Sequence, residues 1–293
     1  MSNQIQYSSQ GQSEWLLSLI NQLNIRKGSV FEAGANSPNH WSNSRIFIES
    51  GWQAYLVESL HELCNEWQEA NFKNVSIYCE GIPYKEKGLE ELLYKINVPR
   101  YLDVLFLDID GGEYHLIKGL DYFRPKFICV EYDPSFPLSI EFVPNTQKAG
   151  WQASSMAFYK LMCSKNYVYI KSFLQDHIFA SKEFIESIDT SLFGTEIGEK
   201  AFLKEGPKNL YQFIDILLGQ SNDRGESGVE KCASNLNMLI ENNYMDYAKT
   251  YYSFMLAAMY SMYKITGYVS KDYKESYSRA LIAFESTYRH IIN

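Results

Sequence analysis

The chain has 293 residues, enough for two domains or for one large domain with an appendage. Its 27 lysines and arginines stand against 35 aspartates and glutamates, and this net charge of -8 argues against a nucleic-acid partner, because phosphates require a basic surface. Hydrophobic residues make up 46% of the chain, which excludes a disordered protein, and the 23 tyrosines are an unusually high number.

The five cysteines are scattered and odd in number, and they lack the close pairs of a zinc site, so no disulfide framework is expected. We therefore expect a reducing, cytoplasmic compartment. The first residues lack the basic start and apolar run of a signal peptide. The most apolar stretch, 251–265, is shorter than the roughly 20 residues of a membrane span, so no membrane span is expected.

In chain order, residues 13–24 carry apolar side chains at helical spacing and predict an amphipathic helix. Short apolar runs then alternate with segments of helical pattern. Several runs are apolar on consecutive residues, which is typical of a parallel sheet covered on both faces. The predicted strands are 28–33, 54–58, 75–79, 102–108, 126–132, 167–173 and 177–181, and the helices expected between them are 43–50, 60–70, 88–96, 113–122 and 154–164. This alternation predicts a doubly wound α/β domain.

The alternating pattern ends near residue 185, so we predict an α/β domain over 1–185. Residues 186–228 contain several glycines and are predicted to be a connector. From 229 to 293 helical spacing dominates, which predicts a helical bundle, and 11 of the 23 tyrosines lie from Tyr211 onward. The stretch 251–265 is apolar nearly all round a helix, so this tail is expected to pack on the α/β domain or to form a homo-oligomer.

Candidate ligand-binding residues lie just after the predicted strands, because open α/β sheets bind ligands at the carboxyl ends of their strands. The first strand is followed by Glu32, Gly34 and Asn36, where a glycine permits close backbone approach to a ligand. The second ends in Glu58, at the spacing from Gly34 at which an acid receives ribose hydroxyls in nucleotide-binding units. An ordinary strand-to-helix turn is the alternative interpretation of the glycine.

The fourth predicted strand has the most acidic ending. Period-two alternation places Asp108 and Asp110 on one face, and the next strand ends in Glu131. These carboxylates could bind a metal, orient a hydroxyl or share a proton, or the aspartates could instead cap the following helix. Residues 106–111 also have the form of the haloacid-dehalogenase phosphatase motif. That motif belongs near the start of its domain and requires a later magnesium-binding Asp pair, so we set this interpretation aside.

Taken together, these segments resemble the FkbM-type S-adenosylmethionine-dependent methyltransferases in order and spacing. The similarity covers about residues 8–181 and is carried by Ser9–Gln12, Phe31–Ala35, Ser42–Ser44, Gly51–Trp52, Leu56–Glu58, Asp103–Tyr114, Arg124–Lys126 and Val130–Tyr132. The sequence departs from the family pattern at Pro38, in the loop after the first strand, and at Gly112 and His115, beside the expected acceptor pocket.

The resemblance implies a Rossmann-like methyltransferase sheet with helices on both faces and S-adenosylmethionine at the first strand ends. Family members are usually O-methyltransferases acting on sugars or natural products, so the resemblance implies a small-molecule or glycan acceptor. The cofactor contacts that it implies are Glu32, Gly34 and Asn36 for the methionine part, Glu58 with Ser59 beside it for the ribose, Glu80 for the adenine, and Asp108.

Methyl transfer to a hydroxyl requires a base, or a metal such as Mg²⁺ that lowers the pKa of the hydroxyl. Asp108, Asp110 and Glu131 are candidates for either role. His115 and His40 are alternative bases. A different class of function also fits the sequence: a non-catalytic cofactor-binding or scaffold protein that acts through its helical tail.

Overall fold

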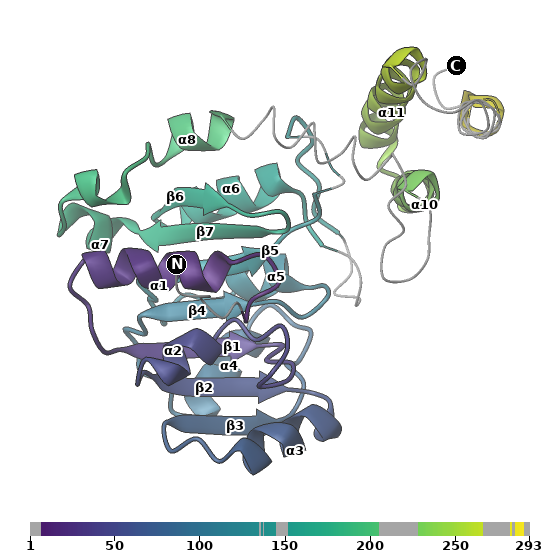
Figure 1. Cartoon of the computed structure of the whole chain (residues 1–293). Helices are drawn as coiled ribbons and strands as arrows, with labels where there is room; N and C mark the ends of the chain where they lie inside the picture. The colour runs from purple at the N-terminus through teal and green to yellow at the C-terminus, as the bar shows by residue number, and fades with distance from the viewer. Residues whose placement is uncertain are drawn as a thin grey trace.

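The computed structural model describes residues 7–134, 136, 138–144, 152–204, 228–265, 282 and 285–289 (Figure 1). Seven strands form one sheet in the order β3-β2-β1-β4-β5-β7-β6, in which β1 to β5 are parallel and β7 is antiparallel to both of its neighbours. The strands are β1 Ser29–Ala33, β2 Gln53–Glu58, β3 Val75–Cys79, β4 Val104–Leu107, β5 Phe127–Glu131, β6 Tyr167–Ser172 and β7 Asp176–Ser181. The chain has a Rossmann-like α/β fold.

Helices cover both faces of this sheet, as the sequence predicts. One buried cluster joins the sheet to α4, α5, α6 and α8, and a second joins it to α1, α2, α3 and η1. The helices are α1 Gln12–Gln22, α2 Arg45–Glu49, α3 His61–Ala70, α4 Gly88–Lys95, α5 Glu113–Lys118, α6 Ser155–Ser164, α7 Lys182–Glu186, η1 Thr190–Phe193 and α8 Glu199–Lys204. The predicted fold class is confirmed.

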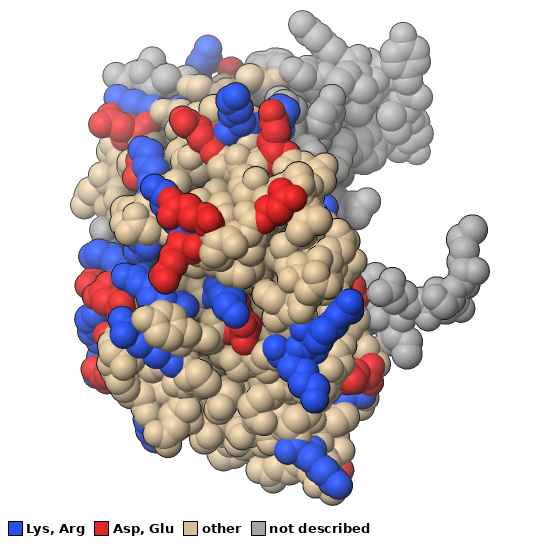
Figure 2. Space-filling view, turned by 90° about the vertical axis from the view of Figure 1, so that its left-hand side faces the viewer, with Lys and Arg blue, Asp and Glu red and all other residues tan. Residues whose placement is uncertain are grey.

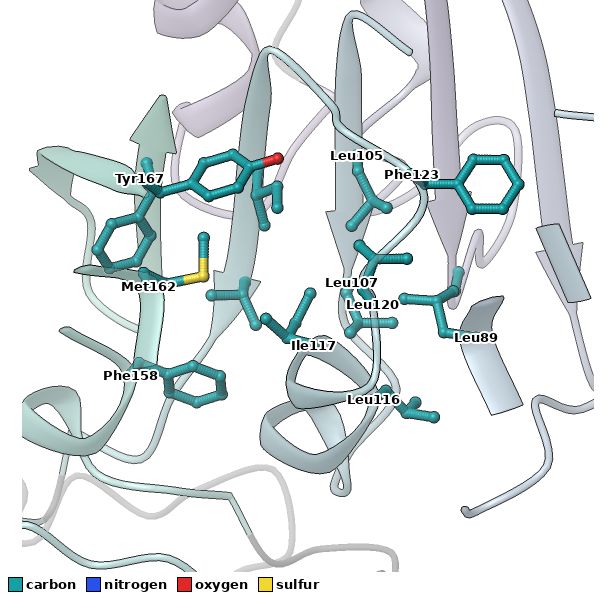
Figure 3. Close-up of a cluster of buried hydrophobic side chains, with 14 of the residues drawn as sticks. Leu89, Leu105, Leu107, Leu116, Ile117, Leu120, Phe123, Phe158, Met162 and Tyr167 are labelled. Carbon is teal, nitrogen blue, oxygen red and sulfur yellow. The ribbon is translucent and has the colours of Figure 1, made fainter. Parts of the chain in front are cut away.

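The central strand β4 shows why the sheet is rigid. All four of its residues are buried, and Leu105 and Leu107 point into the first cluster (Figure 3). Leu116 and Ile117 of α5 and Phe158 of α6 pack against the same cluster. Burying a leucine or phenylalanine side chain contributes about 2 kcal/mol. The strand ends that follow are therefore held on a fixed platform.

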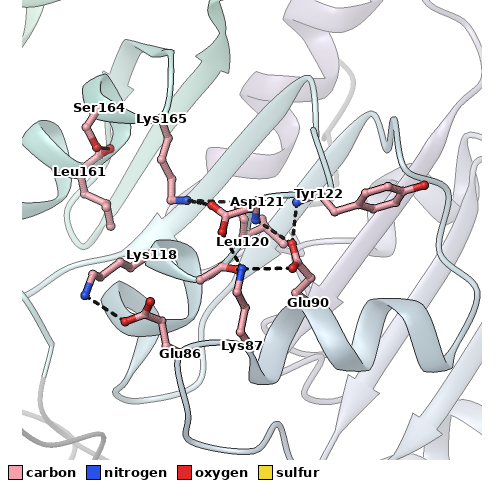
Figure 4. A network of polar contacts seen from close by, with 11 residues as sticks. Glu86, Lys87, Glu90, Lys118, Leu120, Asp121, Tyr122, Leu161, Ser164 and Lys165 are labelled. Carbon is pink, nitrogen blue, oxygen red and sulfur yellow. Dashed lines mark hydrogen bonds and ion pairs between the residues drawn. The ribbon is translucent and has the colours of Figure 1, made fainter.

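A polar network joins the helices that cover one face of the sheet (Figure 4). The Asp121 carboxylate accepts hydrogen bonds from Lys87 Nζ at 2.5 Å and from Lys165 Nζ at 3.0 Å, and the two lysines lower its pKa to about 2. Glu90 accepts from the backbone N–H groups of Asp121 and Tyr122, at 2.7 and 2.6 Å. The network joins the start of α4, the turn before β5 and the end of α6.

The α/β unit extends beyond residue 185. Residues 190–204, predicted as part of a connector, instead form η1 and α8, and Phe202 is fully buried in the first cluster. The apolar side of α8 packs against β6. The predicted boundary was set from the glycines that follow residue 185, and glycine positions carry no information about this contact. The rest of that predicted connector, 205–227, lies outside the described residues.

The helical tail packs on the loop that follows β5. Helices α10 Gly228–Glu241 and α11 Met245–Ile265 bury Leu239, Tyr251 and Tyr252 in a cluster with Phe136 and Phe142 of that loop. The expected packing of the tail on the α/β domain is thus seen in part. Most of the predicted bundle beyond residue 265 lies outside the described residues.

The structure corrects the expectation about cysteines. Cys64 of α3 forms a disulfide with Cys79 of β3, and their Cα atoms lie 5.8 Å apart. The pairing depends on α3 packing beside β3, which cysteine spacing alone does not encode. The cysteines therefore no longer favour a reducing compartment. Among the described residues, no helix is long and apolar enough to cross a membrane.

Candidate functional site

The candidate site lies where the strand order reverses. β1 stands between β2 and β4, and the chain after β1 crosses to one face of the sheet whereas the chain after β4 crosses to the other. Open α/β sheets bind their ligands in a crevice at such a switch point of the carboxyl edge. Gly34 makes the close approach of these two strand ends possible. It has φ +77°, and a Cβ at this position would stand 1.7 Å from the carbonyl oxygen of Asp108. Gly34 therefore fixes the strand spacing, in addition to any contact with a ligand.

We expect Gly34→Ala to lower the free energy of unfolding by about 3 kcal/mol. The new methyl group would collide with the backbone of Asp108, and alanine would be strained in the left-handed conformation of residue 34. Gly51→Ala is the matched control: Gly51 has φ +83°, but no atom of a described residue lies within 4 Å of the position that its methyl group would take. Chemical denaturation of both variants measures the difference. Equal destabilisation of the two would mean that the contact with Asp108 is unimportant.

Glu32 is the anchor of the loop after β1. Its side chain is 0% exposed, and it accepts hydrogen bonds from the Asn43 backbone N–H at 2.7 Å, the Ser44 backbone N–H at 2.9 Å, and the hydroxyls of Ser42 and Ser44 at 3.1 and 2.5 Å. Burial raises its pKa to about 7 despite these donors. Glu32 therefore holds residues 42–44 in place, and its contact with the methionine part stays a prediction.

Glu58 closes the same loop from β2. Its Oε2 accepts the backbone N–H of Asn36 at 2.9 Å, and its Oε1 accepts that of Leu60 at 2.9 Å. Asn36 is in a left-handed conformation, with φ 50°, and its carbonyl receives the indole N–H of Trp67 at 2.8 Å. Ser59 is exposed beside Glu58. Glu58 thus lies at the carboxyl end of β2, bonded to the loop that follows β1, and its contact with a ribose stays a prediction.

Glu80, predicted near the adenine, follows β3 and forms an ion pair with Lys95 at 2.5 Å. Its side chain stays partly exposed. Its neighbour along the same loop, Tyr84, reaches towards β4: its ring lies over Gly112, where a Cβ would stand 3.0 Å from Tyr84 Cδ1. The departure from the family pattern at Gly112 thus leaves room for an aromatic ring at the rim of the crevice.

Asp108 and Glu131 form a hydrogen-bonded pair of carboxyl groups at the ends of β4 and β5. Burial is the main cause that raises the pKa of each, and the Asp108 charge raises that of Glu131 further. Two buried carboxyl groups this close favour a form in which the pair holds one proton between them. Gln152 also donates a hydrogen bond to Glu131 Oε2. Asp110 is exposed, two residues further along, with φ 58°.

Two further buried acids complete this edge of the sheet, and sequence patterns did not single them out. Glu113 accepts the backbone N–H groups of Ile109 and Gly111 at 3.1 and 2.8 Å, and its Oε2 is buried without a hydrogen-bond partner among the described residues. Asp176, at the start of β7, pairs in register with Glu131. Burial raises the pKa of Glu113 to about 7 and that of Asp176 to about 8.

Gln12 of α1 connects the loop after β1 to the start of β7. Its Nε2 donates to Asn43 Oδ1 at 2.9 Å and to Asp176 Oδ2 at 3.1 Å. Gln12 belongs to the first segment of the family resemblance, but its contacts join residues 164 positions apart. The only sequence signal for Asp176 is a charged residue directly before a buried strand.

The edge therefore gathers acids whose negative charge grows as the pH rises through the raised pKa values of Glu32, Glu113 and Asp176. In the described part of the chain, no lysine or arginine forms an ion pair with any of its seven acids, Glu32, Glu58, Asp108, Asp110, Glu113, Glu131 and Asp176. Such an edge repels phosphate and attracts a positively charged ligand.

The geometry does not favour the predicted metal site. Within the residues that the structure describes, no group of three or more His, Cys, Asp or Glu side chains is placed to hold a metal ion. Asp108 and Glu131 bond to each other, and Asp110 faces solvent. Of the alternative bases, His115 has its Nε2 2.8 Å from the carbonyl oxygen of Pro144, and His40 is exposed against Trp41.

No protein-family model matches the sequence, and no curated protein matches it. Among solved structures, the chain is similar to an S-adenosylmethionine-dependent methyltransferase from Aquifex aeolicus, with 11% identity over 58% of this chain and 88% of that one, at a TM-score of 0.36. The N-terminal domain of EvdMO1, solved with S-adenosylhomocysteine and D-fucose, gives 11% identity, coverage of 58% and 81%, and a TM-score of 0.38. Monomeric WbdD gives 11% identity and a TM-score of 0.38, and the match covers 60% of this chain and 42% of WbdD.

Proposed function

We propose that the chain is an S-adenosylmethionine-dependent methyltransferase of the FkbM type that methylates a hydroxyl of a saccharide or glycosylated small molecule. The observation that carries the proposal is the set of acids, without a cationic partner in the described part, at the switch point of a Rossmann-like sheet. Nucleotide cofactors with phosphates are disfavoured at such an edge, whereas a cofactor with a sulfonium and an ammonium group is favoured.

The residues present fit this cofactor. Glu58 Oε1 accepts from Leu60 and Ser59, whereas Oε2 accepts only from Asn36 among the described residues and keeps a lone pair for a ribose hydroxyl. Asn36 and Gly34 shape the loop, and Glu32 fixes it from beneath. Asp110 contributes negative charge at the exposed rim. When bound, S-adenosylmethionine supplies an electrophilic methyl group.

Asp108 is the proposed general base. Its hydrogen bond with Glu131 orients the carboxylate, and the proton that the pair holds prevents a second full charge beside it. A hydroxyl of the acceptor would donate its proton to Asp108 as the new carbon–oxygen bond forms. The Tyr84 ring over Gly112 offers an apolar surface at the rim on which a sugar ring can lie. No metal is needed for this arrangement.

Calorimetry with S-adenosylmethionine and S-adenosylhomocysteine tests the cofactor assignment, and we expect both to bind at micromolar concentration. Binding in the presence of EDTA is expected to be unchanged. Release of S-adenosylhomocysteine with a panel of methyl glycosides then tests the acceptor class. Failure of both cofactor forms to bind at high micromolar concentration would remove the proposal.

The affinity for S-adenosylmethionine is expected to rise by about tenfold between pH 6 and 8, relative to that for S-adenosylhomocysteine. Below their raised pKa values, near 7 to 8, Glu32, Glu113 and Asp176 are protonated and neutral. As the pH rises they ionise and attract the sulfonium, which the homocysteine form lacks, so binding of the methylated form releases protons. Titrations in buffers of different ionisation enthalpy measure this release. A ratio of the two affinities that is independent of pH would contradict it.

A further inference from the structure

A cavity of about 530 Å³ opens at the amino edge of the sheet, opposite the candidate active site. Its walls come from the turn before β5, the starts of β5 and β6, the end of β7 and α7. Four basic side chains line it, Arg124, Lys126, Lys165 and Lys182, and the acids in its lining are Glu183 and Glu186. Figure 2 looks onto this side of the molecule and shows lysines and arginines gathered there, with carboxylates between them.

The basic groups differ in how they are neutralised. Lys126 pairs with Asp103 at 2.6 Å, Lys165 with Asp121 at 3.0 Å, and Lys182 with Glu186 at 3.8 Å. Arg124 forms no ion pair with a described residue. Its guanidinium is therefore the group in the cavity that can receive an anion without first losing a carboxylate partner. Its planar shape suits two parallel hydrogen bonds to a phosphate or carboxylate.

An exposed tyrosine lines the same cavity: Tyr101 is 60% exposed in its wall. Tyr122 and Tyr94, 42% and 51% exposed, pack on each other outside the lining, with ring centroids 5.0 Å apart. The Arg100 guanidinium lies over the Tyr101 and Tyr122 rings, with its carbon 5.1 and 4.6 Å from their centroids. The Arg100 carbonyl accepts the backbone N–H of Arg124, so the aromatic surface and the Arg124 wall are continuous.

We propose that this cavity binds a small saccharide that carries a phosphate or carboxylate group, with Arg124 on the anion and Tyr101 against the apolar face of the sugar ring. The cavity volume suits a mono- or disaccharide derivative. The net charge of -8 disfavours a long polyanion, so a short ligand fits better than a nucleic-acid chain. The site is at the other edge of the sheet from the acids and does not rest on the proposed function.

The experiment is titration calorimetry of the full chain with glucose 6-phosphate and glucuronate, alongside glucose, inorganic phosphate and AMP. We expect the two charged sugars to bind in the high micromolar range and to weaken with added salt. Glucose and inorganic phosphate are expected to bind at least tenfold more weakly, because glucose lacks the anionic group for Arg124 and inorganic phosphate lacks the sugar ring for Tyr101. Equal binding of inorganic phosphate, or tighter binding of AMP, would overturn the saccharide assignment.

Two variants place the ligand in the cavity. Arg124→Gln is expected to lower the affinity for glucose 6-phosphate at least tenfold. Tyr101→Ala is expected to lower that affinity about fivefold and to leave the affinity for inorganic phosphate unchanged. Arg26→Gln, on an exposed arginine of a different surface, is the control and is expected to change nothing. Thermal denaturation confirms that each variant is folded. Unchanged binding in folded Arg124→Gln, or no binding of either charged sugar to the parent chain, would overturn the proposal.

Discussion

Replacing Asp108 with asparagine is expected to lower turnover by about 100- to 10,000-fold, the range that a general base contributes. Asparagine is similar in shape and can still accept the hydrogen bond from Glu131, but it cannot take a proton from the acceptor. Because asparagine keeps the size and one polar oxygen of Asp108, also an expected cofactor contact, the affinity for S-adenosylhomocysteine is expected to stay within about threefold. Release of S-adenosylhomocysteine with a methyl glycoside that the parent chain methylates measures turnover.

Asp110→Asn is the matched control for this experiment. Asp110 is exposed and has φ 58°, a conformation that asparagine also adopts readily, so this variant should fold and retain most of its turnover. Glu131→Gln adds a test of positioning: its amide can still donate to Asp108, so we expect a shifted pH profile with activity retained. Full activity in Asp108→Asn, or loss in Asp110→Asn instead, would move the base to another residue.

Replacing Glu32 with alanine is expected to lower the free energy of unfolding by about 3 kcal/mol and to weaken S-adenosylhomocysteine at least tenfold. The change leaves the donors of Ser42, Asn43 and Ser44 buried without their acceptor, and each such group costs about 1–3 kcal/mol. Burial of the Glu32 carboxyl, whose pKa is about 7, is itself unfavourable, so its removal offsets part of the lost stability. The loop that shapes the cofactor crevice is then no longer held to β1.

Ser42→Ala separates the loop anchor from general destabilisation. It removes the donor of one hydrogen bond, of 3.1 Å, and leaves the other three to Glu32, so a loss of about 1 kcal/mol and nearly unchanged cofactor affinity are expected. Denaturant titration and calorimetry on both variants make the comparison. If Glu32→Ala kept the affinity of the parent chain, Glu32 would have no part in shaping the crevice.

Local sequence patterns predicted a large part of the secondary structure. The strand that ends at Leu107 is buried on both faces, so its apolar run is visible in the sequence, and the acids that follow it mark the carboxyl edge. The helices between strands were predicted for the same reason, because each shows one apolar face. Residues 190–204 were expected to be part of a connector, but they form two short elements, η1 against α1 and α8 against β6, and each is too short to show a period.

The sequence patterns could not predict which residues form hydrogen bonds with the acids. Glu32 was expected to face a ligand, but it is buried under residues 42–44, because the loop turns back over the end of β1. Asp176 joins the site because β7 inserts antiparallel beside β5, which places it opposite Glu131. The disulfide between Cys64 and Cys79 likewise depends on one helix lying against one strand.

The sequence by itself determined the α/β class, the positions of the seven strands and the acidic character of the strand ends. These properties depend on periodicity and composition, which are local and survive without knowledge of neighbours. Only the tertiary structure decided which acids bond to backbone, which share a proton and which face solvent. Those distinctions depend on burial and on contacts between segments as distant as Gln12 and Asp176, 164 residues apart, and they set the pKa values on which the proposed chemistry rests.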